Sequence, residues 1–130
     1  MVYKGEVYSW QRPKGSYYST EVKIKILDYL KSKYPKKTWI KDSKRKGKEM
    51  NLFITPDIFS TDKTLAIELK LGNIYNIIQG LGQCILYKEN GFKRVILIFT
   101  KYSTNPAKFI FDLFNKYGIE LIGESELDRI

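Results

Sequence analysis

Large apolar residues alternate with smaller or charged residues from Leu65 to Leu71, in the middle of the chain. A period of two is that of a β-strand, whose successive side chains point to opposite faces of a sheet. The pattern therefore predicts a strand with its leucines and isoleucine on one face. Glu68 and Lys70 fall together on the other face, two residues apart.

A hairpin is predicted just before this strand. Residues 60–63 are polar and typical of a turn, so the run 55–59 should fold back antiparallel on residues 65–71. Asp57 then lies across from Glu68 and Lys70, and two residues along a strand span roughly 6 to 7 Å. Two carboxylates and a lysine in this arrangement can address one metal-bound water. The alternative is a solvated hairpin face on which Glu68 and Lys70 form a weak surface pair.

Helical periodicity precedes and follows the hairpin. The spacing predicts a helix over residues 16–34, ended by Pro35, with these residues inward: Tyr18, Val22, Ile26, Tyr29 and Leu30. Residues 71–87 carry no formal charge and predict a second helix, too polar and too short for a membrane span. We expect its sheet-facing side to hold Ile74, Ile77, Ile78, Leu81 and Ile85, and its other side to hold Tyr75, Gln79, Gln83, Leu86 and Tyr87.

The last third of the chain predicts a buried strand, a helix and a short strand. The apolar run within residues 92–100 is typical of a strand covered on both faces. Asn105 as N-cap, Pro106 as first helical residue and Gly118 as terminator bound the helix, and residues 119–122 form the strand. With a short strand at residues 39–40, the order is helix, three strands, helix, strand, helix, strand. This order predicts an α/β domain with a mixed sheet flanked by helices.

Composition limits the chemistry that is available. A chain of 130 residues with 43% hydrophobic content predicts a single folded domain, residues 1–130, with residues 1–15 as an arm or loop. It has one cysteine, Cys84, and no histidine, which excludes disulfide frameworks, Cys/His zinc sites and histidine-dependent catalysis. The polar, aromatic start has no apolar run of the kind found in signal peptides, so we expect an intracellular, cytoplasmic location.

The net charge of +9 lies in the first part of the chain, where residues 1–50 hold 14 Lys and Arg against 5 Asp and Glu. Seven of these basic residues fall in the loop and strand of residues 36–48, beside Trp39. Such a segment suits contacts with a phosphate backbone, although a heat-adapted, lysine-rich composition or a solvated loop would look the same. The predicted nucleic-acid contacts are Arg12, Lys14, Lys36, Lys37, Lys41, Lys44, Arg45, Lys46 and Lys48.

Pro56-Asp57, ten intervening residues and then Glu68-Leu69-Lys70 resemble the signature of the PD-(D/E)XK, or restriction-endonuclease-like, nucleases. The resemblance covers roughly residues 12–100 and implies that superfamily's αβββαβ core with a short C-terminal extension of a helix and a strand. It implies Mg²⁺, with Mn²⁺ able to substitute, held by Asp57, Glu68 and the main-chain carbonyl of Leu69. Lys70 would orient the attacking water.

Two further site residues rest on the resemblance. Arg12-x-Lys14-Gly15-Ser16 before a helical glutamate is similar to the opening of Holliday-junction resolvases, which makes Glu21 a candidate ligand. Glu21 also fits a solvated, salt-bridged helix face. Gln83-x-x-x-Tyr87 resembles an element that lines the site in recombination-helicase nucleases, which makes Gln83 a candidate orienting group.

These features predict a Mg²⁺-dependent DNA endonuclease most similar to the small Holliday-junction resolvases. An exonuclease or end-processing enzyme of the helicase-associated type, and a basic nucleic-acid-binding module without catalysis, are the alternatives. Two symmetric nicks need two active sites, so we expect a homodimer built on the uncharged side of the helix in residues 71–87, through Tyr75, Leu86 and Tyr87.

Overall fold

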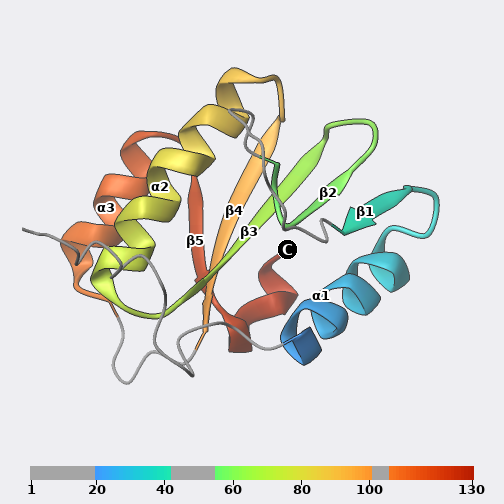
Figure 1. Ribbon diagram of the computed structural model, residues 1–130, viewed down its shortest axis with the longest axis horizontal. Coiled ribbons are helices and arrows are strands. Elements are labelled where there is room, and N and C mark those ends of the chain that lie inside the picture. The colour runs from blue at the N-terminus through green and yellow to red at the C-terminus, as the bar shows by residue number, and fades with distance from the viewer. Residues whose placement is uncertain (1–19, 42–54, 101–105) are drawn as a thin grey trace, which may run out of the picture.

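The computed structural model describes residues 20–41, 55–100 and 106–130. They form a five-stranded mixed sheet with helices on both faces (Figure 1). The strands lie side by side in chain order; β1, β2 and β3 pair antiparallel, whereas β3, β4 and β5 pair parallel. The predicted element order is confirmed, with these bounds: α1 Thr20–Lys33, β1 Trp39–Lys41, β2 Ile58–Ser60, β3 Leu65–Leu71, α2 Ile74–Glu89, β4 Arg94–Thr100, α3 Lys108–Lys116, β5 Glu120–Gly123 and the 3₁₀ helix η2 Glu124–Arg129.

Each face of the sheet has its own apolar core. The β3–α2–β4 and β4–α3–β5 connections step in the same direction across the sheet, and right-handed crossovers of this kind place both helices on one face. Figure 1 shows α2 and α3 on that face, with α1 and η2 on the other. Ile67 and Leu69 of β3 pack in the α1 core, whereas Ala66 packs in the α2 core. The two faces of β3 are therefore divided as the alternating sequence predicts.

Turn chemistry fixes the hairpin. Ser60 ends β2 and Leu65 begins β3, with Lys63 at φ 63° in the left-handed region. The Ser60 hydroxyl accepts a hydrogen bond from the Leu65 N–H at 3.1 Å, and Asp62 accepts one from the Thr64 N–H at 3.1 Å. These bonds set the register in which Ile58 pairs with Ile67. The predicted hairpin is confirmed.

The start of α3 differs from the sequence prediction. Pro106 is not helical; Ala107, at ψ 153°, is the N-cap, and the helix begins at Lys108. The extended backbone at Ala107 prevents a helical turn from forming earlier. Gly118, at φ 71°, follows the helix as predicted. Asn105 lies outside the described residues.

The rotation of α2 also differs from the prediction. Ile74 and Ile78, predicted to face the sheet, are 38% and 41% exposed, whereas Tyr87, predicted to face outward, is 1% exposed. Glu68 and Lys70 project from β3 beneath the helix, where the Tyr87 hydroxyl meets Glu68 and the bare backbone of Gly80 meets Lys70. Ile77 and Leu81 face the sheet as predicted. The buried residues of α2 are Ile77, Gly80, Leu81, Cys84 and Tyr87.

No helix in the three described segments is both long enough and apolar enough to cross a membrane.

Candidate active site

Two carboxylates and a lysine meet under α2. Asp57 directly precedes β2, and continuing the register in which Ile58 pairs with Ile67 places Asp57 opposite Glu68. One carboxylate oxygen of Asp57, Oδ2, accepts a hydrogen bond from the Leu69 N–H at 2.8 Å. The Lys70 ammonium lies 3.7 Å from Oε2 of Glu68. The structure therefore brings the three predicted side chains together at the end of the hairpin.

The cluster is buried. Asp57, Glu68 and Lys70 are 8%, 5% and 6% exposed. The alternative of a solvated hairpin face is therefore wrong, because α2 covers this face of β3. Buried charges are rare unless they are paired or bind a ligand, so the cluster needs an explanation that a surface ion pair does not.

Tyr87 is the fourth member of the cluster. Its hydroxyl donates a hydrogen bond to Oε1 of Glu68 at 2.6 Å and also lies 3.3 Å from the main-chain oxygen of Thr55. The hydroxyl has one proton and can donate it to only one of these oxygens. With Glu68 protonated, the carboxylic acid would donate to Tyr87, which would then donate to Thr55. Tyr87 therefore holds Glu68 in one orientation in either protonation state.

The surroundings of Glu68 favour its protonated form. Burial, and then the nearby charge of Asp57, raise the pKa of Glu68 to about 8, although the Lys70 ammonium and the Tyr87 hydrogen bond lower it. One lysine and one hydroxyl therefore do not offset the desolvation of this carboxylate and its repulsion by a second one. A pair of carboxylates in this condition favours an additional positive charge between them.

A hard divalent cation such as Mg²⁺ fits the donors that are present. Asp57 and Glu68 supply carboxylate oxygens, which Mg²⁺ prefers. The N–H and C=O of one strand residue point to the same edge of the strand, so the Leu69 carbonyl shares the edge on which its N–H meets Asp57. Within the described segments, no group of three or more His, Cys, Asp or Glu is placed to hold a metal. The fit therefore rests on two carboxylates and one carbonyl.

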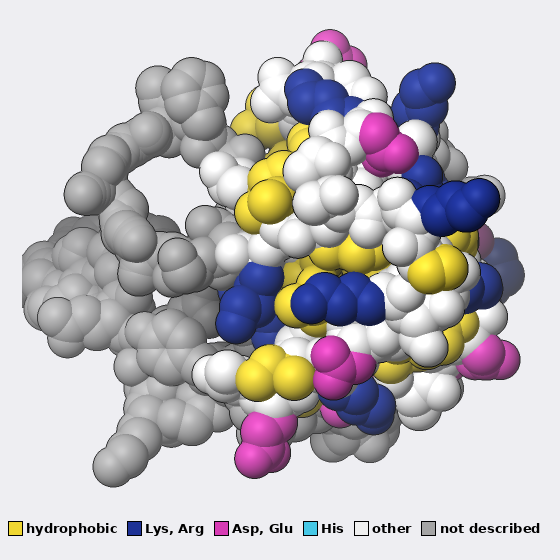
Figure 2. All heavy atoms as spheres, turned by 90° about the vertical axis from the view of Figure 1, so that its right-hand side faces the viewer, with side chains coloured by type: hydrophobic (Ala, Val, Ile, Leu, Met, Phe, Trp, Pro, Cys, Tyr) yellow, Lys and Arg dark blue, Asp and Glu magenta, His cyan; other side chains and the backbone are white. Residues whose placement is uncertain are grey.

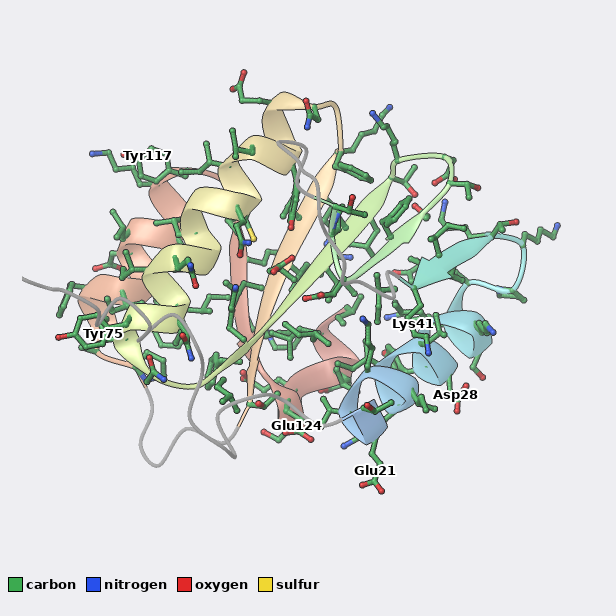
Figure 3. The ribbon with its side chains drawn as sticks, in the orientation of Figure 1. Glu21, Asp28, Lys41, Tyr75, Tyr117 and Glu124 are labelled. Atoms are coloured by element: carbon green, nitrogen blue, oxygen red, sulfur yellow. The ribbon has the colours of Figure 1, made fainter. Side chains whose placement is uncertain are left out.

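Glu21 lies apart from this cluster. It is exposed in the first turn of α1, and α1 covers the opposite face of β3 from Glu68 and Lys70. Figure 3 shows its side chain pointing away from the sheet. The structure does not bring Glu21 to the two carboxylates.

Gln83 is half-buried on α2, one turn before Tyr87. Its carbonyl oxygen Oε1 is buried and has no hydrogen-bond partner among the described residues. An amide oxygen in this condition can accept a hydrogen bond from a water or a ligand. The structure gives no contact between Gln83 and the carboxylates, so its role as an orienting group stays a prediction.

The predicted basic surface is described only in part. Lys36 and Lys41 are exposed, and Lys37 forms an ion pair with Asp62 at 2.8 Å. Figure 2 views the side of α1, β1 and the hairpin turn, where Lys and Arg side chains alternate with acidic and apolar ones. These predicted contacts lie outside the described residues: Arg12, Lys14, Lys44, Arg45, Lys46 and Lys48.

The apolar pattern placed Tyr87 on the wrong side of α2, although the Gln83-x-x-x-Tyr87 resemblance pointed to a residue that lines the site. Neither Gly80 nor Cys84 was predicted to lie beside the cluster. Cys84 is buried beside the cluster, and burial, followed by the Glu68 charge, raises the pKa of its thiol. The sequence carried one signal for Gly80, because a glycine in a helix interior is less stable than an alanine and therefore indicates a close approach of the helix backbone to a neighbour.

Comparison of the chain with protein-family models, with curated proteins and with solved structures found no match.

Proposed function

We propose that this protein is a Mg²⁺-dependent nuclease that hydrolyses DNA phosphodiester bonds, with a preference for branched DNA similar to that of Holliday-junction resolvases. The observation that carries the proposal is the pair of buried carboxylates, Asp57 and Glu68, beside a single lysine. Desolvation and mutual repulsion make this pair costly, and a divalent cation would offset both. A purely structural role would be served as well by apolar side chains.

The chemistry follows from the positions of the groups. Asp57, Glu68 and the Leu69 carbonyl would hold Mg²⁺, which when bound supplies Lewis-acid stabilisation of the phosphate and activation of water. Lys70 would orient the attacking water and offset the negative charge that develops on the phosphate in the transition state. The hydrogen bond from Tyr87 to Oε1 would hold the Glu68 carboxylate in a fixed orientation for this ligation.

The basic residues of the first 50 positions would hold the DNA through its phosphates. Such contacts fix the position of a duplex without reading its sequence. The proposal therefore predicts selectivity for the shape of the DNA rather than for its base sequence.

A substrate panel tests the function. The protein would be incubated in Mg²⁺ with labelled four-way junction, flap, linear duplex and single strand, beside Asp57→Asn as the control for contaminating nuclease. Paired symmetric incisions of the junction, absent in the variant, are the expected result. A ladder of products from DNA ends would indicate an exonuclease and contradict the proposal. DNA that is retarded in a gel but stays intact would indicate a binding module without catalysis.

We propose that the nuclease acts as a homodimer, because two incisions need two sites. The exposed apolar side chains of α2 are Ile74, Tyr75, Ile78 and Leu86, and Figure 3 shows Tyr75 on the outer side of the helix. Tyr87 belongs to the core and not to this surface, which corrects the patch predicted from the sequence. Sedimentation without DNA should give twice the chain mass of 15.3 kDa. A monomer at micromolar concentration would contradict the dimer.

A further inference from the structure

Gly80 lies in the middle of α2 at the point where the helix crosses Lys70. A Cβ placed on Gly80 would overlap Cδ1 of Leu97 in β4. It would also lie 3.1 Å from Cγ and 3.3 Å from Cε of Lys70, both tighter than ordinary contact. The helix backbone therefore rests directly on the lysine side chain, and no larger residue fits without a shift.

Gly82 provides the comparison within the same helix. A Cβ on Gly82 would meet nothing within 4 Å, and the residue is exposed. Both glycines carry the same conformational entropy cost of a helix interior. Only at Gly80 does a close approach of α2 to the sheet require the missing side chain.

This approach confines the side chain that the proposed reaction uses. Contacts at both Cγ and Cε show that the Lys70 stem runs along the helix backbone, rather than touching it only at its tip. Its ammonium emerges 3.7 Å from Oε2 of Glu68. A lysine stem has four rotatable bonds, and burial of the Lys70 stem against the backbone of α2 restricts this freedom.

We propose that Gly80 is a positioning residue, which lets α2 clamp the Lys70 stem and so fixes the ammonium beside the two carboxylates. The inference rests on the proposed function, since the position of the ammonium matters for turnover only if the cluster hydrolyses DNA. Gly80 itself would touch no reacting atom. Its effect passes through Lys70.

Turnover of a matched pair of variants gives the first test. Gly80→Ala should lower kcat for junction cleavage by about 10- to 100-fold, because small misplacement of a catalytic group has effects of this size. KM should change little, because Gly80 is buried on the sheet-facing side of α2, away from the solvent. Gly82→Ala makes the same chemical change two residues away and should leave kcat and KM at their wild-type values.

Chemical labelling gives a second readout that does not need activity. Lys70 is 6% exposed, so an amine-acylating reagent should modify it slowly, with exposed Lys36 as the internal reference in peptide mass spectrometry. Labelling of Lys70 should accelerate several-fold in Gly80→Ala and stay at the wild-type rate in Gly82→Ala. Thermal denaturation of both variants would establish that they are folded.

A further variant covers the case in which Gly80→Ala does not fold. Gly80→Ala with Leu97→Val removes the Cδ1 atom that the new methyl group would overlap, while the contact with Lys70 remains. This double variant should fold, label faster at Lys70 and turn over slowly relative to Leu97→Val alone. Wild-type kcat and wild-type labelling in either folded Gly80 variant would overturn the inference and leave the proposed function intact. Faster labelling in a protein whose wild type cleaves no DNA would instead overturn the proposed function.

Discussion

The two faces of β3 are equally buried but chemically opposite. On the α1 face, Ile67 and Leu69 are 0% and 1% exposed among other aliphatic side chains. On the α2 face, Glu68 and Lys70 are 5% and 6% exposed, with Asp57 beside them. One strand therefore contributes to stability through one face and places charges in the core through the other.

Under the proposed function, this contrast assigns stability to one face of the seven-residue strand and chemistry to the other. Burying an Ile or Leu side chain stabilises a fold by about 1.5 to 3 kcal/mol. Burying an ion pair often contributes no net stability, because desolvation equals or exceeds the Coulomb attraction. The raised pKa of Glu68, about 8, indicates that attraction does not win here. We infer that the α2 face is kept for its chemistry and that the α1 face supports it.

The largest expected effect comes from removing the charge of Glu68. Glu68→Gln should lower cleavage at least about a thousand-fold, equal to ~4 kcal/mol in activation free energy, because the proposed metal site would lose a ligand. Above pH 8 the free energy of unfolding should be higher in Glu68→Gln than in the wild type, because wild-type Glu68 must then carry an unfavourable buried charge. Cleavage assays and urea denaturation would measure the two changes. Glu89→Gln, at an exposed carboxylate of the same helix, is the matched control and should alter neither.

Shortening the neighbouring residue on the other face should give the reverse result. Ile67→Ala leaves a cavity in the α1 core and should lower the free energy of unfolding by about 2 to 5 kcal/mol. The fraction that remains folded should cleave at nearly the wild-type rate, because Ile67 points away from the carboxylates. Denaturant titration and cleavage at low temperature would measure both. A catalytic defect as large as that of Glu68→Gln would show that the two faces are not separate.

The pH dependence of stability should also separate the two faces of β3. The folded pKa of Glu68, about 8, lies above its ordinary value of 4.5, so between these values folded Glu68 keeps a proton that the unfolded chain has lost. The contribution of Glu68 to the free energy of unfolding should therefore be largest below about pH 4.5. It should fall as the pH rises to 8, by up to about 1.4 kcal/mol per pH unit.

Urea denaturation in chelator across this range would measure that slope. Glu68→Gln should flatten it and Glu89→Gln should keep it. The pKa of Asp62 is lowered, chiefly by the hydrogen bond from Lys37. Its contribution to the free energy of unfolding is therefore lost only as the pH falls below this window. A slope that survives Glu68→Gln would place the responsible group elsewhere.

The hairpin and its charged face could be predicted from the sequence because both depend on local rules. A period of two and a polar turn at residues 60–63 are sufficient to place Asp57 opposite Glu68. The rotation of α2 could not be predicted in this way, because the spacing of its isoleucines carries no information about the charged groups that lie beneath the helix. Gly80 and Tyr87 face the sheet because of what β3 carries, and this is a tertiary effect. Glu21 was expected from resemblance alone, which does not determine the face that α1 covers.

The proposed function requires Asp57 and Glu68 to form a metal-dependent hydrolytic site. Its most direct test is the rate of four-way-junction cleavage over a range of Mg²⁺ concentrations, for wild type and for Asp57→Asn at equal, folded protein concentration. We expect wild-type cleavage to rise from zero with Mg²⁺ and to saturate, while Asp57→Asn still binds the junction without metal and cleaves nothing. Undiminished cleavage by Asp57→Asn, or wild-type cleavage that persists in chelator, would contradict a metal-dependent site at these two residues.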